Sequence, residues 1–206
     1  MKGKWLISLA LLLTVDMSAA DFRDLYSHLN YGIEWGYTST LLNSYHYNYI
    51  SSHGARVNSA HDYWTYKSNG HLLAFLGVKF AKKCSADVYY GWMGAYEDRR
   101  MNPLTLRGTY YINGYGSNGL KLFAEGGAGL ARTFFKQKSY VYKAGLGERI
   151  MLGPGYAMDL SISAQRVNDH PTDVYDVWNG VSVPDGNLRK SVCKYLGVNF
   201  SITLAF

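Results

Sequence analysis

The sequence predicts an all-β chain, folded as an eight-stranded antiparallel up-and-down transmembrane β-barrel. Three observations lead to this prediction. Apolar residues recur at every second position through eight segments, which is the period of a β-strand with one apolar face. The segments are about 10 to 14 residues long, enough for the roughly 9–11 residues that a tilted strand needs to cross a bilayer. Charged residues and glycines gather on the opposite face of the same segments.

The eight segments follow one another with no stretch of helical period between them. They cover 28–38, 71–82, 87–97, 104–113, 120–133, 140–151, 156–165 and 194–206. The apolar faces of the first four carry Leu29, Tyr31, Ile33, Trp35 and Tyr37; Leu72, Ala74, Leu76, Val78 and Phe80; Val88, Tyr90, Trp92, Gly94 and Tyr96; and Leu104, Leu106, Gly108, Tyr110 and Ile112.

The last four segments repeat this alternation. Their apolar faces carry Leu120, Leu122, Ala124, Ala128 and Leu130; Tyr142, Ala144, Leu146 and Ile150; Tyr156, Met158, Leu160, Ile162 and Ala164; and Leu196, Val198, Phe200, Ile202 and Leu204. Connections after the second, fourth and sixth segments are short, whereas 39–70 and 166–192 are long. Outer-membrane barrels have short periplasmic turns and longer outer loops, so we expect these two long connections to be outer loops.

The parity opposite to the apolar face is expected to line the barrel interior. A lipid-facing Lys or Arg at mid-bilayer costs about 2–4 kcal/mol, which explains why the apolar parity carries few charges. Inside, acids and bases pair in a network, and glycines leave room for the long side chains. The predicted interior charge network comprises Glu34, Lys79, Asp87, Glu97, Arg107, Lys121, Glu125, Lys143, Arg149 and Asp159.

Aromatic residues and the chain ends support a membrane location. Tyr and Trp favour membrane interfaces, and we expect Trp35, Tyr37 and Tyr96 near the outer strand ends and Tyr156 and Phe206 near the inner ends. Residues 1–20 have a basic head, a short apolar run and a small-residue end. This is typical of a signal peptide cleaved near Ala20, which leaves 21–206 as the barrel domain.

Charge and cysteine content narrow the remaining classes. The formal net charge is +6 without a pronounced basic cluster, so no nucleic-acid partner is expected. Cys84 and Cys193 are the only cysteines. The strand assignment places them at opposite ends of the barrel, about 25 Å apart, whereas the Cα atoms of a disulfide lie within about 7 Å. We therefore expect two unpaired thiols.

The leader, the eight amphipathic strands, the glycine-rich stretches "LFAEGGAGLART" and "YKAGLGERIML" and the terminal Phe206 resemble the small outer-membrane β-barrel proteins of Gram-negative bacteria, of the OmpA/OmpX-like kind. The resemblance implies localisation in the cell outer membrane, contact with its lipid, and insertion by the barrel-assembly machinery. In that family the machinery reads the last strand and its terminal aromatic, which implies that Phe206 is the assembly signal.

The sequence says less about activity. We expect a monomer with a plugged interior and no cofactor or metal, and a structural role or an interaction with a surface ligand or host factor through loops 39–70 and 166–192. One alternative is a barrel-embedded hydrolase or acyltransferase that modifies lipid A. Its catalytic candidates are His46, His53, His61, His170 and Asp173. A second alternative is a soluble lipocalin-like ligand-binding barrel, with apolar residues inside.

Overall fold

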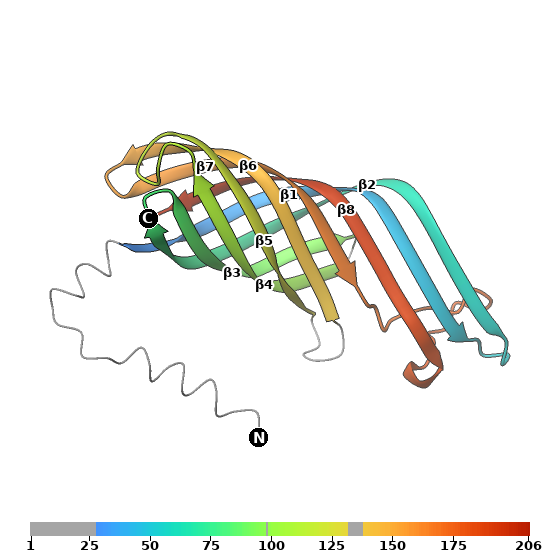
Figure 1. Ribbon diagram of the computed structural model, residues 1–206. Coiled ribbons are helices and arrows are strands. Elements are labelled where there is room, and N and C mark those ends of the chain that lie inside the picture. The colour runs from blue at the N-terminus through green and yellow to red at the C-terminus, as the bar shows by residue number, and fades with distance from the viewer. Residues whose placement is uncertain (1–27, 98, 132–137) are drawn as a thin grey trace, which may run out of the picture.

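The computed structural model describes residues 28–97, 99–131 and 138–206, with side chains omitted at 130, 131 and 138. It is a closed barrel of eight strands (Figure 1). The strands are β1 Leu29–Ile50, β2 Arg56–Ala81, β3 Cys84–Tyr96, β4 Arg99–Tyr111, β5 Gly119–Ala131, β6 Lys138–Gly153, β7 Tyr156–Asp169 and β8 Leu188–Ala205, with a short 3-10 helix, η1, at Asp185–Asn187.

Each strand pairs with its sequence neighbour in antiparallel register, and β1 pairs with β8 to close the ring. At this seam Ile33 lies opposite Leu204. Beyond the last paired residue, the backbone N–H of Phe206 donates to the carbonyl of Tyr31 at 2.8 Å. The closed up-and-down topology confirms the predicted fold class and is the architecture of the small outer-membrane barrels that the sequence resembles.

The two faces of the barrel have the predicted polarity. The outward side chains Trp35 and Leu106 are 51% and 59% exposed, whereas the neighbouring inward side chains Glu34 and Arg107 are 0% and 1% exposed. Large apolar side chains therefore form a belt around the outside, and eight charged side chains of the barrel strands are buried in the lumen. A lipocalin-like barrel requires the opposite distribution.

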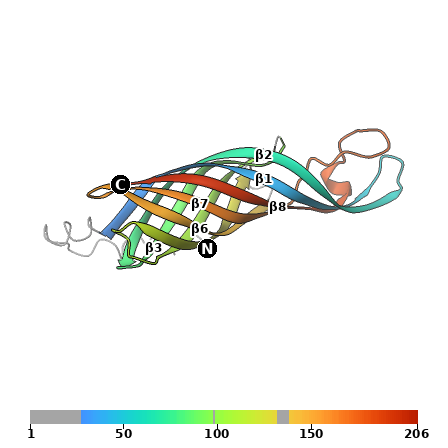
Figure 2. The same cartoon turned by 90° about the horizontal axis from the view of Figure 1, so that it is seen from above.

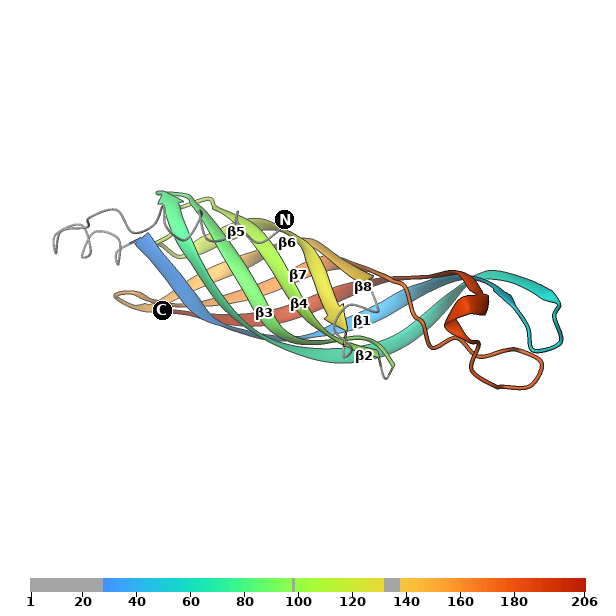
Figure 3. The ribbon, with the colours of Figure 1, turned by 90° about the horizontal axis from the view of Figure 1, so that it is seen from below.

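The prediction of a long loop over residues 39–70 is wrong. β1 and β2 continue through it as one hairpin whose turn lies between Ile50 and Arg56. Together with the start of β8 they form a three-stranded extension beyond the barrel, on the end opposite to the C-terminus (Figure 1). Figures 2 and 3 show the 170–187 connection beside the tip of this hairpin. This connection is shorter than the predicted loop 166–192, because β7 and β8 both extend into that range.

The extension escaped sequence analysis because neither of its faces is uniformly apolar. Residues 43–50 and 56–69 mix Tyr, Trp, Val and Ile with Ser, Thr, Asn, His and charged residues, so the period of two gives no consistent hydrophobic contrast. Tyr, Val and Thr nevertheless favour extended backbone. The register of β1 shifts between Thr40 and Leu42. Even-numbered residues of β1 face the lumen before this shift and face outward after it, so that Leu42 pairs with the outward Leu196.

A second irregularity corrects two predictions on the third strand. The β3–β4 register shifts between Gly94 and Tyr96. Tyr96 is consequently buried in the mouth of the barrel, where its ring stacks on that of Tyr195, and is not part of an outer girdle. Glu97 follows with φ +47° and an exposed side chain that pairs with Lys67 at 3.4 Å. It does not belong to the interior charge network.

Other predictions concern the chain's start and its thiols. The predicted signal peptide 1–20 and its cleavage site lie outside the described residues. Within the residues described here, no helix has both the length and the apolar character needed to span a membrane. Cys84 begins β3, Cys193 lies in β8, and both are free, as predicted.

Candidate functional site

The centre of the lumen is built around Arg107 of β4, which joins two carboxylates from other strands. Its guanidinium donates to Glu34 of β1 at 3.0 Å and to Glu125 of β5 at 2.8 Å. The guanidinium carbon also lies 4.0 Å from the ring centroid of Tyr89 and 4.6 Å from that of Phe123. Because charge-assisted hydrogen bonds and the faces of two rings surround it, this buried cation is held in one position.

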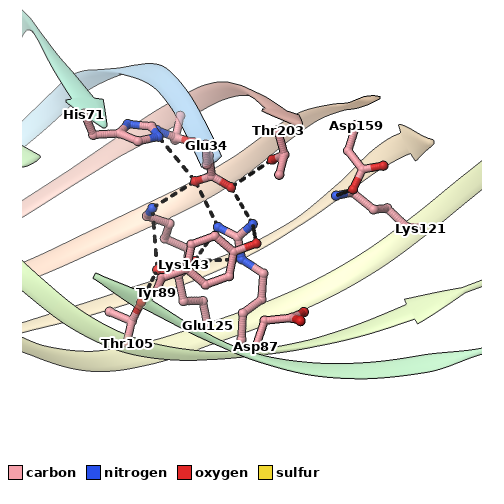
Figure 4. Close-up of polar contacts among 12 residues, drawn as sticks. Glu34, His71, Asp87, Tyr89, Thr105, Lys121, Glu125, Lys143, Asp159 and Thr203 are labelled. Atoms are coloured by element: carbon pink, nitrogen blue, oxygen red, sulfur yellow. Dashed lines mark hydrogen bonds and ion pairs between the residues drawn. The ribbon is translucent and has the colours of Figure 1, made fainter. Parts of the chain in front are cut away.

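Further polar side chains complete the shell of the two carboxylates (Figure 4). The ammonium of Lys143 lies 3.7 Å from Glu34 and 3.6 Å from Glu125. His71 Nε2 lies 3.3 Å from Glu34, and the hydroxyl of Thr203 donates to the same carboxylate at 3.2 Å. Strands from around the barrel are thus tied together through Glu34.

A second cluster surrounds Asp159 of β7. Lys121 donates to it at 2.6 Å, and Arg149 donates through Nε at 2.7 Å and Nη2 at 2.9 Å. The Arg149 guanidinium lies 4.4 Å from the ring centroid of Tyr111 and 4.2 Å from that of Tyr115. Arg149 is therefore placed like Arg107 at the centre of the lumen, with aromatic rings against its guanidinium and a carboxylate accepting its hydrogen bonds.

The inner end of the lumen is covered by the β4–β5 turn. The hydroxyl of Tyr115 in this turn donates to Asn30 at 2.6 Å, and Asn30 donates to Asp87 at 2.6 Å. Ser85 donates to the other Asp87 oxygen at 2.8 Å. Lys79 is only partly buried here, and its ammonium lies 4.5 Å from the Tyr115 ring centroid. It therefore lies at the edge of the network.

Eight of the ten residues predicted for the interior network are buried in the lumen, four cations and four acids. They are Glu34, Asp87, Arg107, Lys121, Glu125, Lys143, Arg149 and Asp159. Glycines admit some of the bulky polar groups: a Cβ on Gly36 would lie 2.6 Å from His71 Cε1. His71 and Tyr89 were not among the predicted interior residues, although both lie on the inward parity. It had no signal for Tyr115, which only the folded turn places over the lumen.

At the outer mouth, tyrosines and one thiol lie near one further ion pair, Arg99 with Asp169 at 3.4 Å. Tyr47 and Cys193 are in hydrogen-bond contact, with 2.9 Å between Oη and Sγ. Burial raises the pKa of the Cys193 thiol. Asn43 donates to Tyr63 at 2.6 Å, while burial and the Tyr96 hydroxyl raise the pKa of Tyr63 to about 12. The Cys193 thiol and the Tyr63 hydroxyl are therefore protonated at neutral pH and act as hydrogen-bonding and packing groups.

The 170–187 connection is anchored to the hairpin tip by Asp176. Its carboxylate accepts from the Ser52 backbone N–H at 3.0 Å, the Ser52 hydroxyl at 3.2 Å and the Trp178 N–H at 3.1 Å. Burial alone would raise the pKa of Asp176. The hydrogen bonds lower it by more than burial raises it, so the pKa lies below its ordinary value. Beneath this anchor Tyr49 packs with Val174 and Val183. The anchored connection leaves four apolar side chains exposed: Tyr175, Val177, Trp178 and Val181.

The catalytic candidates do not form a Ser-His-Asp site in the described part of the chain. His46 bonds Asn58 and Lys190, and His61 stacks on Tyr63. His53 is exposed next to Ser52, whose hydroxyl donates directly to Asp176 without an imidazole between them. A nucleophilic serine needs an imidazole to take its proton.

The other two candidates lie at the start of the 170–187 connection. The backbone N–H of His170 donates to Asp169, and Asp173 accepts from Arg99 at 3.1 Å. Among the described residues, no group of three or more His, Cys, Asp or Glu side chains is placed to hold a metal ion.

A scan against protein-family models finds no match, and a search of curated proteins finds none either. Among solved structures, the chain resembles the outer membrane protein OprG from Pseudomonas aeruginosa, at 14% identity and TM-score 0.45, over 84% of this chain and 95% of that one. It also resembles the outer membrane protease OmpT from Escherichia coli, at 10% identity and TM-score 0.39, over 87% and 96%. These likenesses are distant, and no activity is carried over from either protein.

Proposed function

We propose that this chain is an integral outer-membrane β-barrel that presents an ordered platform at the cell surface. The observation that carries the proposal is the distribution of polarity, with an apolar belt outside and paired charges inside. In water, a belt containing residues such as Trp35, Leu106 and Phe200 would be an exposed apolar surface far larger than soluble monomers tolerate. In a bilayer the same belt faces hydrocarbon.

The proposed barrel is plugged and monomeric. The lumen holds the side chains of Arg107, Arg149 and their partners, which supports a packed interior because eight strands enclose little more than their own side chains. Tyr115 covers the inner end. Pairing of β1 with β8 leaves no edge in the barrel for a second copy to fill.

Export and assembly follow from the two chain ends. Residues 1–20 are proposed to direct secretion and to be removed near Ala20. Phe206, with its ring centroid 6.0 Å from that of Tyr31 and 5.9 Å from that of Tyr156, is proposed to be the terminal aromatic recognised by the barrel-assembly machinery. The exposed position of Phe206 at the strand end supports this role.

The proposed role at the surface is interaction with a ligand or host factor. Two features support it: the extension carries the chain beyond the belt, and the Asp176 anchor fixes the connection that exposes Tyr175, Val177, Trp178 and Val181. Exposed apolar side chains on an ordered loop lower the solubility of a protein, and they are common at interaction sites.

The barrel is tested by electrophoresis of heated and unheated protein from fractionated cells. We expect the protein in the outer-membrane fraction and a mobility shift on heating. Recovery in the soluble fraction without a shift would refute the membrane barrel.

The surface role is tested by adhesion of cells that display the protein to immobilised host matrix proteins and glycans. We expect Trp178→Ser with Val177→Ser to abolish binding, and Trp64→Ser, at a still more exposed position on β2, to retain it. Equal adhesion by cells with and without the wild-type protein, on every surface, would remove the interaction role and leave a structural one.

A further inference from the structure

The outward face of β7, β8 and β1 changes from apolar to basic where the belt ends. In one row of paired residues, Leu196 lies between Leu42 and Arg166. Two residues along β8, Lys194 lies opposite Ser44. Leu196, Arg166 and Lys194 are all exposed. The last apolar side chains of the belt thus lie directly beside cations.

This face is hollowed in two adjoining places that share Lys194. The hollow nearer the belt has a volume of about 260 Å³ and is lined by Leu42, Leu196 and Arg166, among others. The farther hollow has a volume of about 540 Å³ and includes Lys190 in its lining. Combined, they have the size of a small-molecule site, with an apolar end toward the belt and a polar end away from it.

The charges along these hollows are unbalanced. Arg166, Lys190 and Lys194 contribute three positive charges, and Asp62 contributes one negative charge. This contrasts with the eight buried charges of the predicted lumen network, which comprise four cations and four acids. A surface with an unmatched positive charge beside apolar side chains is complementary to an amphiphile with an anionic head.

His46 orients the Lys190 ammonium at the polar end. Lys190 Nζ lies 3.0 Å from His46 Nδ1, and because an ammonium only donates, Nδ1 is the acceptor. The proton of the neutral ring is then on Nε2, which donates to Asn58 at 2.9 Å. The imidazole therefore orients the Lys190 ammonium without neutralising its charge.

We propose that these adjoining hollows bind a lipid of the outer leaflet whose phosphate head carries a net negative charge, with the phosphate at Arg166, Lys190 and Lys194 and the apolar part along Leu42 and Leu196. Arginine and lysine are the side chains that proteins use for phosphate. The continuity of the apolar end with the belt favours a lipid over a free anion. This inference rests on the proposed membrane location, since only then does the belt edge meet lipid headgroups.

The test uses the full-length protein reconstituted in nanodiscs of phosphatidylcholine, with or without phosphatidic acid. Native mass spectrometry after gentle release counts the lipids that stay bound. We expect retention of phosphatidic acid over phosphatidylcholine, and we expect Lys190→Glu with Lys194→Glu to reduce its affinity about tenfold or more, or roughly 1.4 kcal/mol. Lys82→Glu with Lys83→Glu makes the same charge change at the opposite barrel end and should retain the wild-type preference.

Three results would overturn the proposal. These are wild-type retention by the Lys190/Lys194 variant, equal loss in the Lys82/Lys83 variant, and displacement of phosphatidic acid by inorganic phosphate at equal concentration. The last result would indicate a site for free anions. Electrophoretic heat shift is recorded for every variant, so a failure of the barrel itself is seen separately from a failure of lipid binding.

Discussion

Strands β1, β2 and β8 each run through two regions, the closed barrel and the three-stranded extension, and the two regions are stabilised differently. In the barrel, charges are buried in pairs, as at Glu34 and Arg107, and the apolar side chains face outward. In the extension, β2 pairs with β1 alone, because its pairing with β3 begins only at His71. Charges such as Lys190 are exposed there, and tyrosines pack on the inner face.

The difference in charge distribution reflects the two environments, hydrocarbon and water, that a single strand passes through. Hydrocarbon outside the barrel disfavours charge, so the lumen takes eight charges of the barrel strands and must pair them, because an unpaired buried ion is costly. Glu148 on β6 is an exception on the outward face. Water around the extension solvates charge on either face, so pairing is unnecessary. Register shifts at Thr40/Leu42 in β1 and at Gly94/Tyr96 in β3 lie where the chain passes from one environment to the other.

The largest expected effect is loss of the central lumen cation. Arg107→Met leaves Lys143 as the one Lys or Arg side chain beside the two carboxylates of Glu34 and Glu125. We therefore expect the free energy of unfolding in bilayers to fall by about 3–5 kcal/mol. Urea titration followed by the electrophoretic shift measures it. Arg100→Met, an exposed change on the same strand, should cost less than about 1 kcal/mol.

A double variant sharpens this test. Arg107→Met with Glu125→Gln removes one charge of each sign, so we expect it to recover part of the lost stability. If Arg107→Met alone unfolds at the wild-type urea concentration, the buried pairs do not hold the barrel together.

The next effect compares the outward faces of the two regions. Leu106→Lys places a charge in the middle of the belt and should cost about 2–4 kcal/mol in a bilayer. Tyr66→Lys, at a 75% exposed position of the extension, should change stability by no more than about 0.5 kcal/mol. Equal costs, measured by the same urea titration, would contradict the assignment of the belt to lipid and the extension to water.

A smaller, local effect concerns the Asp176 anchor. The folded pKa is lowered, so its contribution is fully present above the unfolded Asp value of about 3.9 and is lost as pH falls through the folded pKa. Hydrogen exchange of 170–187 should therefore quicken only in strong acid. Asp176→Asn should quicken it at pH 7, about fivefold or more, with the barrel unchanged. Asp185→Asn, in η1, is the matched control, and equal exchange in both variants would dismiss the anchor.

The last effect is one of reactivity, with no expected change in stability, and compares the two thiols. Cys193 is buried with a raised pKa, whereas Cys84 is partly exposed at the start of β3. We expect maleimide to modify Cys193 about tenfold more slowly than Cys84 at pH 8, as followed by mass spectrometry. Tyr47→Ala should speed the Cys193 reaction, because Tyr47 contacts its sulfur. Equal rates in the wild type would place Cys193 outside the packed mouth.

Sequence analysis located the lumen residues well because their signal is local. Glu34, Arg107 and Asp159 alternate with apolar neighbours, and the period of two assigns them to one face without further information. Glu97 was misassigned because a bulge breaks this period and leaves no mark in composition. The 39–70 segment was read as a loop because both of its faces are polar.

The alternation along the chain is sufficient to predict the number and order of the barrel strands and the apolar face of each, because a shift of one residue would turn every lumen charge outward. The pairing of the charges is visible only in the folded barrel, because Glu34 meets Arg107 across it, at a separation of 73 residues. Only the tertiary structure brings Asp176 to Ser52, at a separation of 124 residues. Such contacts depend on barrel closure and strand stagger, which are properties of all eight strands together and are not encoded in any single segment.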